Sequence, residues 1–420
     1  YLNHDPYEAF RVANFRAYMF GWFTSLIGTR IQSVAIGWEI YQRTGKALSL
    51  GLVGLVQALP NMLLALPAGY LADTFDRRKL IISSLAGTTV TSVSLAVLSY
   101  LQGNTYLMYL LLLFDATALA LGRPARSALL PQIVPRQAFA NAVMWSTSTF
   151  HLSSAIGPAI GGFIVAANVP SAYLISACGT LIFIGLLTRI DICDFPTRDG
   201  SKSITFKTLL AGLRFVWNTK LLLTTMLLDM FAVLLGGAIY LLPIFAKDIL
   251  KVGEIGFGCL NAAPAIGAVI MAIMIAHLPP MQQAGRNLLL SVAGFGLVTV
   301  IFGLSKYFWL SFIMLFLTGV LDNVSVVIRH TLVQLLTPDQ MRGRVSAVNS
   351  IFIGASNELG GFESGLVASW FGAVVSVVIG GIGTMLVVVT TALAAPKLRR
   401  LQSLQHIQAF EEEKKQKIVN

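Results

Sequence analysis

Twelve apolar stretches, each long enough to cross a bilayer as a helix, constrain this chain more than any other feature of its sequence. A helix needs roughly 20 apolar residues to span about 30 Å of hydrocarbon. The stretches lie near residues 17–42, 48–72, 80–102, 105–126, 139–167, 171–190, 221–247, 255–277, 287–304, 308–330, 343–369 and 372–394. Because lipid offers the backbone no hydrogen-bond partners, such segments cross it as helices. The pattern predicts an all-α membrane protein with twelve transmembrane helices and both termini on one side.

The charged residues agree with this count. Loops rich in Lys and Arg are translocated poorly and therefore stay on the cytoplasmic side. Under the twelve-helix topology, nearly all of the 30 Lys and Arg residues lie at one face. The exceptions are Arg43, Lys46, Lys247, Lys251 and Lys306 in outer loops and Arg30 within a span. We therefore expect a multi-pass protein of the plasma membrane with both termini in the cytoplasm.

Composition excludes several classes of function. With 55% hydrophobic and 12% charged residues, the 420-residue chain is too apolar for an ordinary soluble domain. Its net charge of +11 resides in loops between spans, so we expect contact with anionic lipids and not with nucleic acid. Cys178, Cys193 and Cys259 form no disulfide or metal-ligand pattern, and no phosphate-binding loop or nucleophile elbow occurs. We predict no cofactor, no metal site and no enzymatic activity.

A short charged loop joins the second and third spans. It reads Gly69-Tyr70-Leu71-Ala72-Asp73-Thr74-Phe75-Asp76-Arg77-Arg78-Lys79. This pattern resembles the signature loop between helices 2 and 3 of the major facilitator superfamily of transporters. The resemblance implies that Gly69 lets two helices approach closely and that Asp73 lies near a helix N-terminus. It also implies a cytoplasmic charge network around Asp76, Arg77 and Arg78. Without the resemblance, the loop is a solvated turn that only sets orientation.

The two halves of the chain repeat a motif. Arg126, Leu129, Pro135 and Gln137 follow the fourth span, and Arg329, Leu332, Pro338 and Gln340 follow the tenth span at the same offset. Transporters built from such half-repeats bind substrate near the middle of the membrane, between the halves. We expect two pseudo-symmetric six-helix bundles, at residues 1–190 and 221–394, with Arg126 and Arg329 in equivalent loops.

Two polar segments lie outside the bundles. In the linker at 191–220, apolar residues recur at helical spacing from Phe206 to Trp217. This spacing predicts either a helix in the membrane surface or a cytoplasmic extension of the seventh span. In the tail at 395–420, apolar residues recur from Leu398 to Ile407. There we expect a cytoplasmic amphipathic helix, which either regulates the protein or is a solvated surface element.

The fifth span contains Gly157-Pro158-Ala159-Ile160-Gly161-Gly162, which we call the helix-5 motif. Glycines let neighbouring backbones pack closely, and proline bends a helix. The motif resembles the fifth-helix motif of export members of the same superfamily. Its alternative interpretation is a close-packed kink that has no bearing on the direction of transport.

Further segments indicate a branch of the family. Asn14–Arg16, Gly122–Pro131, Phe139–Ala142 and Met341–Val345 resemble drug and siderophore exporters of the enterobactin type, and the resemblance covers nearly the whole chain. Relatives in this branch often carry an aspartate after the Ser-x-x-Gly of helix 1, where this chain has Thr29 and Arg30. A proton site is therefore absent at that point, and Arg30 instead favours an anionic substrate.

Ionisable residues within spans are the candidate functional residues, because each is costly in lipid unless it is paired or lines water. They are Arg30, Asp115, Asp229, Asp322 and Glu358, in spans 1, 4, 7, 10 and 11. The resemblance implies that helices 1, 4, 7 and 10 line a central cavity. One interpretation is that the carboxylates bind protons or a cationic group during transport. The alternative is a static pair, such as Arg30 with Asp115. Glu39 and Glu363 are possible gate residues toward the outer face.

Together these features predict a monomeric secondary transporter that works by alternating access. We expect a proton-coupled exporter of a small molecule, such as a drug or siderophore. The alternatives are an exporter of metal ions or lipid-like molecules, a lipid scramblase, a membrane-embedded enzyme, or a sensor that has the fold of a transporter but carries no flux. Protons and membrane lipids are the other expected partners.

Overall fold

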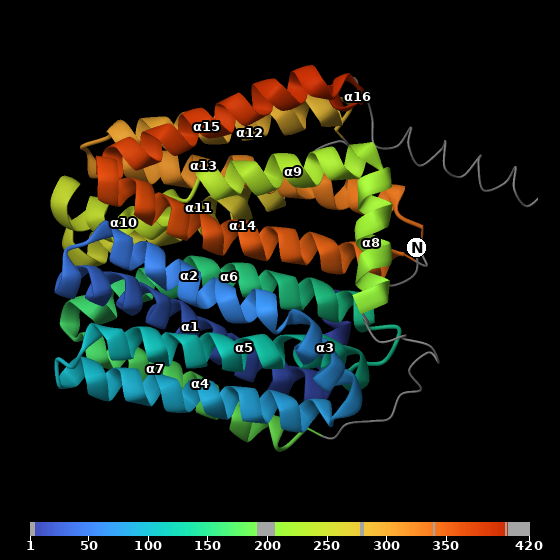
Figure 1. Cartoon of the computed structure of the whole chain (residues 1–420). Coiled ribbons are helices and arrows are strands. Elements are labelled where there is room, and N and C mark those ends of the chain that lie inside the picture. The colour runs from blue at the N-terminus through green and yellow to red at the C-terminus, as the bar shows by residue number, and fades with distance from the viewer. Residues whose placement is uncertain (1–4, 191–205, 278–280, 339–340, 400, 402–420) are drawn as a thin grey trace, which may run out of the picture. The chain divides into compact units, whose positions relative to one another are not determined.

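The computed structural model of the protein describes residues 5–190, 206–277, 281–338, 341–399 and 401 (Figure 1). Every regular element within these ranges is a helix, so the backbone satisfies its own hydrogen bonds, as a membrane-spanning segment must. The predicted twelve-helix, all-α membrane fold is confirmed.

The spans of the first half follow the prediction closely, with one break. They are α1 (Ala13–Thr44), α2 (Ala47–Leu63) continued by α3 (Ala65–Thr74), α4 (Arg77–Tyr100), α5 (Thr105–Ile133), α6 (Phe139–Ala167) and α7 (Val169–Leu187). The predicted second span is bent by 52° between α2 and α3. Pro67 explains the bend, because it has no N–H to donate to the preceding turn and its ring crowds that turn.

The second half also contains one broken span. Its helices are α9 (Lys220–Leu235), α11 (Gly253–His277), α12 (Ala284–Leu304), α13 (Phe308–Leu336), α14 (Arg342–Phe371) and α15 (Ala373–Ala394). The seventh span, predicted as one helix, ends at Leu235 and continues as η2 (Ala238–Leu241), α10 (Leu242–Ile244) and the π-helix η3 (Phe245–Ile249). A Cβ atom at Gly237 would lie 2.5 Å from the Gly360 carbonyl oxygen, so glycine allows the chain to break here against α14.

Hydropathy alone does not reveal every span. In the part of the chain that the structure describes, nine helices are long and apolar enough to cross a membrane, and α2 with α3 makes a tenth. The other two are α1 and α14, which are 32 and 30 residues long. Both are long enough to cross the hydrocarbon core, but their polar and ionisable residues lower their hydropathy.

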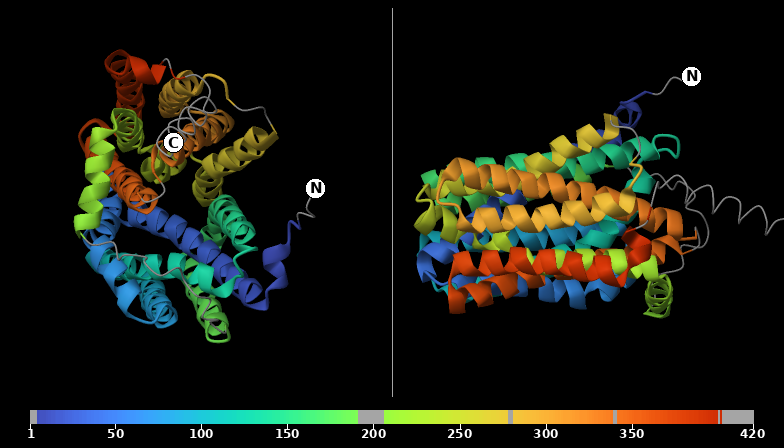
Figure 2. Two further views of the ribbon diagram at one scale, coloured as in Figure 1. Left: turned by 90° about the vertical axis from the view of Figure 1, so that its right-hand side faces the viewer. Right: turned by 90° about the horizontal axis from the view of Figure 1, so that it is seen from above.

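The chain forms two compact units. Unit 1 is Tyr1–Thr205 with Leu242–Ala262, and unit 2 is Phe206–Leu241 with Ala263–Asn420. In unit 1, α7 packs against α1 and α4, α4 against α5, and α6 against α1. In unit 2, α15 packs against α9 and α12, α12 against α13, and α14 against α9. Corresponding spans therefore pack in the same pattern in both units, and within each unit they run side by side (Figure 2).

Shorter helices flank the spans. The helix η1 (Glu8–Arg11) precedes α1, and α16 (Pro396–Arg399) follows α15. The segment predicted to be helical in the linker forms α8 (Phe206–Asn218), which runs across the direction of α9 and α14 (Figures 1 and 2). This orientation favours the surface helix over an extension of the seventh span. The tail begins by packing Leu398 into the core of unit 2, and residues 402–420 lie outside the described ranges.

Close contact between α1 and α7 depends on small residues. A Cβ atom at Gly179 of α7 would lie 2.5 Å from the Thr24 carbonyl oxygen of α1. A Cβ atom at Gly28 would lie 2.8 Å from Cα of Ser176. Both obstacles are backbone atoms, which cannot rotate away. The two helices therefore pack at a separation that only glycine permits at these positions.

We expect Gly179→Ala to destabilise the protein by about 1–3 kcal/mol, because the added methyl group forces α7 away from α1. The matched control is Gly185→Ala in the same helix, where a Cβ atom would meet no atom within 4 Å. Thermal unfolding of the purified protein in detergent measures both. Equal unfolding temperatures for the two variants would contradict the close-contact explanation.

Candidate functional site

Arg30, the ionisable residue predicted in the first span, lies along one face of α6. A Cβ atom at Gly157 would lie 2.5 Å from Cβ of Arg30, and the Arg30 guanidinium carbon lies 5.1 Å from the centre of the Phe150 ring. Residues seven apart share a helix face, so the side chain extends along α6 from Gly157 to Phe150. In the described ranges, Arg30 forms no ion pair with an acidic residue.

Asp115 of α5 is 7% exposed. Its Oδ1 accepts a hydrogen bond of 2.8 Å from the Thr91 hydroxyl of α4. The structure therefore places Asp115 against a neutral partner on α4, whereas Arg30 stacks against α6. The static Arg30–Asp115 pair, which was the alternative interpretation of these two residues, does not form among the described residues.

Glu39, predicted as a possible gate residue, is held in place by three helices. Its side chain is ion-paired with Arg43 of α1. It also accepts hydrogen bonds of 2.7 Å from Ser99 of α4 and 2.6 Å from Tyr173 of α7. Arg43 in turn donates to the Gly103 carbonyl oxygen at 2.6 Å. This network satisfies the buried charges and ties α1, α4 and α7 together, which is the arrangement of a structural anchor.

Next to this network, α1 contacts the end of the broken seventh span. The Tyr41 hydroxyl donates a hydrogen bond to Asp248, and the Lys247 ammonium lies 5.6 Å from the centre of the Tyr41 ring. Trp38 stacks on Phe257 of α11 with 5.6 Å between ring centres. These contacts explain why this part of the second half belongs to unit 1.

In unit 2, one arginine joins two of the predicted carboxylates. Arg329 of α13 is 7% exposed and forms an ion pair with Asp229 of α9. Its Nη2 lies 3.9 Å from Oδ1 of Asp322, and its Nε donates to the Ser325 hydroxyl at 3.1 Å. Asp322, Ser325 and Arg329 share one face of α13, because their spacing is three and four residues. The two carboxylates therefore act as one cluster around a shared cation, which we call the Arg329 cluster.

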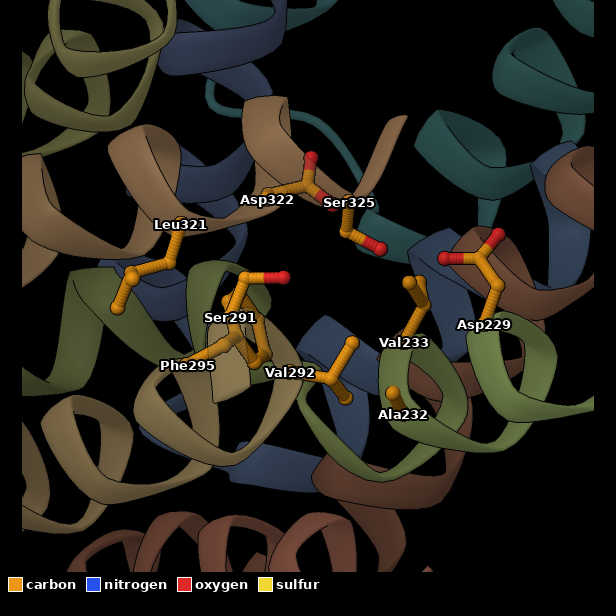
Figure 3. Close-up of a pocket in the computed structure, with 9 residues that line it drawn as sticks. All are labelled: Asp229, Ala232, Val233, Ser291, Val292, Phe295, Leu321, Asp322 and Ser325. Atoms are coloured by element: carbon orange, nitrogen blue, oxygen red, sulfur yellow. The ribbon is translucent and has the colours of Figure 1, made fainter. Parts of the chain in front are cut away.

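A small pocket adjoins the Arg329 cluster (Figure 3). It is lined by Asp229, Ala232, Val233, Ser291, Val292, Phe295, Leu321, Asp322 and Ser325. The hydroxyl groups of Ser291 and Ser325 point into the space between the labelled residues in Figure 3. Its volume of about 10 Å³ has room for about one water molecule. The pocket can hydrate the cluster but is too small for an organic substrate.

The remaining predicted acidic residues lie on α14. Glu358 is half-buried and accepts a hydrogen bond from the Tyr240 hydroxyl at 3.5 Å. Glu363 accepts one from the Ser364 hydroxyl at 3.3 Å. These two contacts are separate from the Arg329 cluster, which is built from α9 and α13.

The charged loop after the second span organises helix ends. Asp76 caps the N-terminus of α4, accepting from the backbone N–H groups of Arg78 at 2.9 Å and Lys79 at 3.4 Å. Arg77 donates to the Ala128 carbonyl oxygen of α5 at 3.0 Å, and Arg78 donates to that of Thr188 at the end of α7. Cations are favourable at the C-terminal ends of helices. The two arginines therefore tie three helices together.

The roles that the resemblance implied for Gly69 and Asp73 stay predictions. A Cβ atom at Gly69 would meet no atom within 4 Å among the described residues. Asp73 is exposed in the last turn of α3, and no ion pair involves it among the described residues. These two residues are separate from the arginine contacts a few positions later.

The helix-5 motif packs against two helices of unit 1. A Cβ atom added to Gly157 would lie 2.5 Å from Cβ of Arg30, and one added to Gly161 would lie 3.2 Å from Cα of Ile31. A Cβ atom added to Gly162 would lie 2.9 Å from Cα of Gly258. The motif therefore brings α6 close to both α1 and α11. Pro158 is accommodated within a single assigned helix, Phe139–Ala167. Close packing is confirmed, and its relation to export stays a prediction.

The two arginines of the repeat were predicted in loops, but they lie within α5 and α13 because both helices extend beyond the predicted spans. Their environments differ. Arg329 binds two carboxylates, as described above. Arg126 forms no ion pair with an acid in the described ranges, and its buried Nε has no hydrogen-bond partner there. The sequence repeat therefore marks equivalent positions but not equivalent interactions.

Sequence reasoning did not anticipate the partners of several polar residues. Arg329 was predicted in a loop and Asp229 and Asp322 in spans, so their ion pairs were not predicted. Thr91 and Tyr173 were not identified as partners of acidic residues. The three-residue and four-residue steps from Asp322 to Ser325 and Arg329 were a signal that these side chains share a helix face. No comparable signal connects Thr91 with Asp115, because they lie on different helices.

Comparison with known proteins agrees with the fold and identifies the family. The model of the transmembrane secretion effector family matches residues 4–419. An enterobactin exporter of Shigella boydii serotype 18 is 29% identical over 391 residues, covering 92% of this chain and 93% of the relative. An enterobactin exporter of Escherichia coli O81 shows the same identity and coverage.

Solved transporters share the fold at low sequence identity. A bacterial homologue of the human lysosomal transporter Spinster, in an inward-facing conformation, has a TM-score of 0.70 and 14% identity, covering 94% of this chain and 97% of that one. The D-xylose–proton symporter has a TM-score of 0.66 and 13% identity, covering 91% and 96%. At such identities the likeness shows the fold alone.

We expect Arg329→Gln to destabilise the protein by about 3–5 kcal/mol, because it leaves Asp229 buried without its cation. The double variant Arg329→Gln/Asp229→Asn should recover most of the loss, since neither partner then carries a charge. Thermal unfolding in detergent, arranged as a double-mutant cycle, measures this coupling. Arg126→Gln, which removes no ion pair, should have the smaller effect. Purely additive losses would show that the Arg329–Asp229 pair does not stabilise the fold.

Proposed function

As a member of the transmembrane secretion effector family within the major facilitator superfamily, this chain is a multi-pass secondary transporter that exports a small molecule, and we propose that it couples export to proton entry. The family consists of transporters, which sets aside the alternative of a membrane-embedded enzyme. The proposal adds the coupling ion, the residue that carries it and the class of substrate.

The environment of Asp115 is the observation that carries the proposal of proton coupling. Its carboxyl group is 7% exposed and accepts a hydrogen bond from the neutral Thr91 hydroxyl. No ion pair with a cation compensates its charge among the described residues. Ionisable groups within spans are typical of proton pathways. Binding a proton would remove the uncompensated charge, so Asp115 is our candidate for the coupling group.

The Arg329 cluster has a supporting role in this proposal. Asp229 and Asp322 already share a cation, so a proton arriving there competes with Arg329. Release of one carboxylate from Arg329 during transport would make that carboxylate available for a proton. We therefore place Asp115 first in the proton pathway and the cluster second, with Glu358 as a further candidate on α14.

The proposed mechanism is alternating access, in which two half-repeats rock about a site between them. In this proposal the bundles at 1–190 and 221–394 open the site to the cytoplasm and to the outside in turn. Asp73 and Arg77 would stabilise the state in which the cytoplasmic side is closed. The helix-5 motif would keep α6 packed on α1 while the bundles move. The protein would act as a monomer.

The relatives support a siderophore or a similar organic molecule as the substrate, because they are enterobactin exporters. A drug-like compound remains the second choice within the same class. Within the residues that the structure describes, no group of three or more metal-ligating side chains occurs, so nothing favours a free metal ion as cargo. The cationic loops support a plasma-membrane protein with both termini in the cytoplasm.

We test the proposal with labelled enterobactin and inside-out vesicles whose lumen is acidified. Proton flow out of the lumen should drive uptake of the label in vesicles that contain the wild-type protein. Asp115→Asn should abolish the acceleration by the pH gradient but retain exchange of internal for external substrate, because exchange needs no net proton movement. Glu8→Gln, which alters a carboxylate outside the spans, is the control. Uptake by Asp115→Asn that still responds fully to the gradient would refute this coupling group.

A further inference from the structure

Arg30 has no ion-pair partner of opposite charge among the described residues, a property that it shares with Asp115 and Arg126 in unit 1. Glu39 is neutralised by Arg43, and the carboxylate of Asp115 is hydrogen-bonded by Thr91. Arg30 has the Phe150 ring beside its guanidinium group and no ion pair in the described ranges. A guanidinium group has five N–H donors, and an aromatic ring occupies only one face of it.

Two serine hydroxyls lie on the part of α6 that Arg30 covers. Ser153 and Ser154 are one helical turn from both Phe150 and Gly157, and they therefore lie on the same side of α6 as these two contacts of Arg30. Ser153 is 0% exposed. The hydroxyl oxygens of both serines are buried and have no hydrogen-bond partner in the part of the chain that the structure describes.

Other hydroxyl groups in the spans show that this situation is unusual. Thr88, Thr117 and Thr147 each donate to a backbone carbonyl oxygen of their own helix. A serine hydroxyl in a helix can likewise donate to the backbone carbonyl oxygen one turn earlier. Ser153 and Ser154 do not, so two unpartnered donors lie on the face of α6 that Arg30 follows from Gly157 to Phe150.

A bound oxyanion would satisfy all of these groups at once. Guanidinium groups bind carboxylates and phosphates with two parallel hydrogen bonds, and serine hydroxyls donate to the same oxygens. The Phe150 ring is 41% exposed, which leaves an apolar surface for the body of the molecule. Since lipid supplies no counter-ion, a ligand that carries the negative charge is the natural partner.

We propose that Arg30, Ser153, Ser154 and Phe150 form a binding site for the anionic group of the exported molecule. The substrate class is then an organic anion with an aromatic or apolar body. This inference rests on the proposed function, because it assigns part of the substrate site of an exporter.

The test uses the purified full-length protein in detergent and two dyes with the same ring system. Fluorescein is anionic and rhodamine 123 is cationic, and fluorescence anisotropy measures the saturable binding of each. We expect the wild-type protein to bind fluorescein about tenfold or more tightly than rhodamine 123. Arg30→Gln should weaken fluorescein binding by about tenfold or more, as expected for the loss of charge-assisted hydrogen bonds. Binding of rhodamine 123 should stay constant or become tighter.

Further variants separate a binding role from a structural one. Arg30→Lys keeps the charge but loses the planar pair of donors, so it should retain part of the fluorescein affinity. The double variant Ser153→Ala/Ser154→Ala removes only unpartnered hydroxyls and should leave the unfolding temperature unchanged while weakening fluorescein binding several-fold. If Arg30→Gln fails to fold, this double variant and Arg30→Lys carry the test. Arg11→Gln is the charge control, because Arg11 is 79% exposed and outside the spans.

Three results would overturn the site. They are equal binding of the two dyes by the wild-type protein, no saturable binding of fluorescein, and unchanged fluorescein affinity in a folded Arg30→Gln variant. The assay requires no pH gradient, so its failure is distinct from failure of proton coupling. If the Arg30→Gln variant shows the same gradient-driven uptake as the wild-type protein, the anion site is refuted and the proposed transport stands. If fluorescein binds as expected but no gradient-driven uptake occurs, the proposed coupling is refuted and the anion site stands.

Discussion

A charged group inside a bilayer must find its partners within the protein, and this requirement accounts for most of the polar architecture of the chain. Glu39 is satisfied by Arg43, Ser99 and Tyr173 from three helices, and Arg329 holds Asp229 and Asp322 from two. Each network joins helices that apolar packing alone would orient less specifically. Asp115, Arg30 and Arg126 have no such ion-pair partner among the described residues, and in our proposals Asp115 exchanges protons and Arg30 binds substrate.

The two units solve the same packing problem with different charges. Corresponding spans pack in the same pattern, as expected for a duplicated six-helix bundle. The repeated arginines show how far the copies have diverged, because Arg329 binds two carboxylates and Arg126 binds none in the described ranges. In our proposal, unit 1 provides the anion site and the coupling carboxylate, whereas unit 2 provides a tightly paired cluster. A symmetric scaffold thus carries an asymmetric set of charges.

Much of the fold was predictable, because length and hydropathy determine where a chain crosses lipid. The fifth span was predicted at residues 139–167, and α6 has the same bounds. The breaks in the second and seventh spans were harder to predict. The second span was predicted without a break, although Pro67 lies within it, and the end of α9 at Leu235 depends on the contact of Gly237 with Gly360 in another helix. The candidate site was predictable as a set of residues and not as a set of contacts. Whether Asp115 faces Thr91 or Arg30 depends on how each helix is rotated about its axis, which periodicity in long apolar spans does not determine.

The broken seventh span has a consequence for how the protein assembles. Leu242–Ala262 belongs to the second half of the chain but to the first compact unit, where Trp38, Tyr41 and Gly162 receive it. This arrangement is an intramolecular exchange of an element, comparable to domain swapping between subunits. A fragment that ends in the linker would therefore lack a segment that packs against α1 and α6. During synthesis, the first unit must remain incomplete in the membrane until the ribosome has passed residue 262.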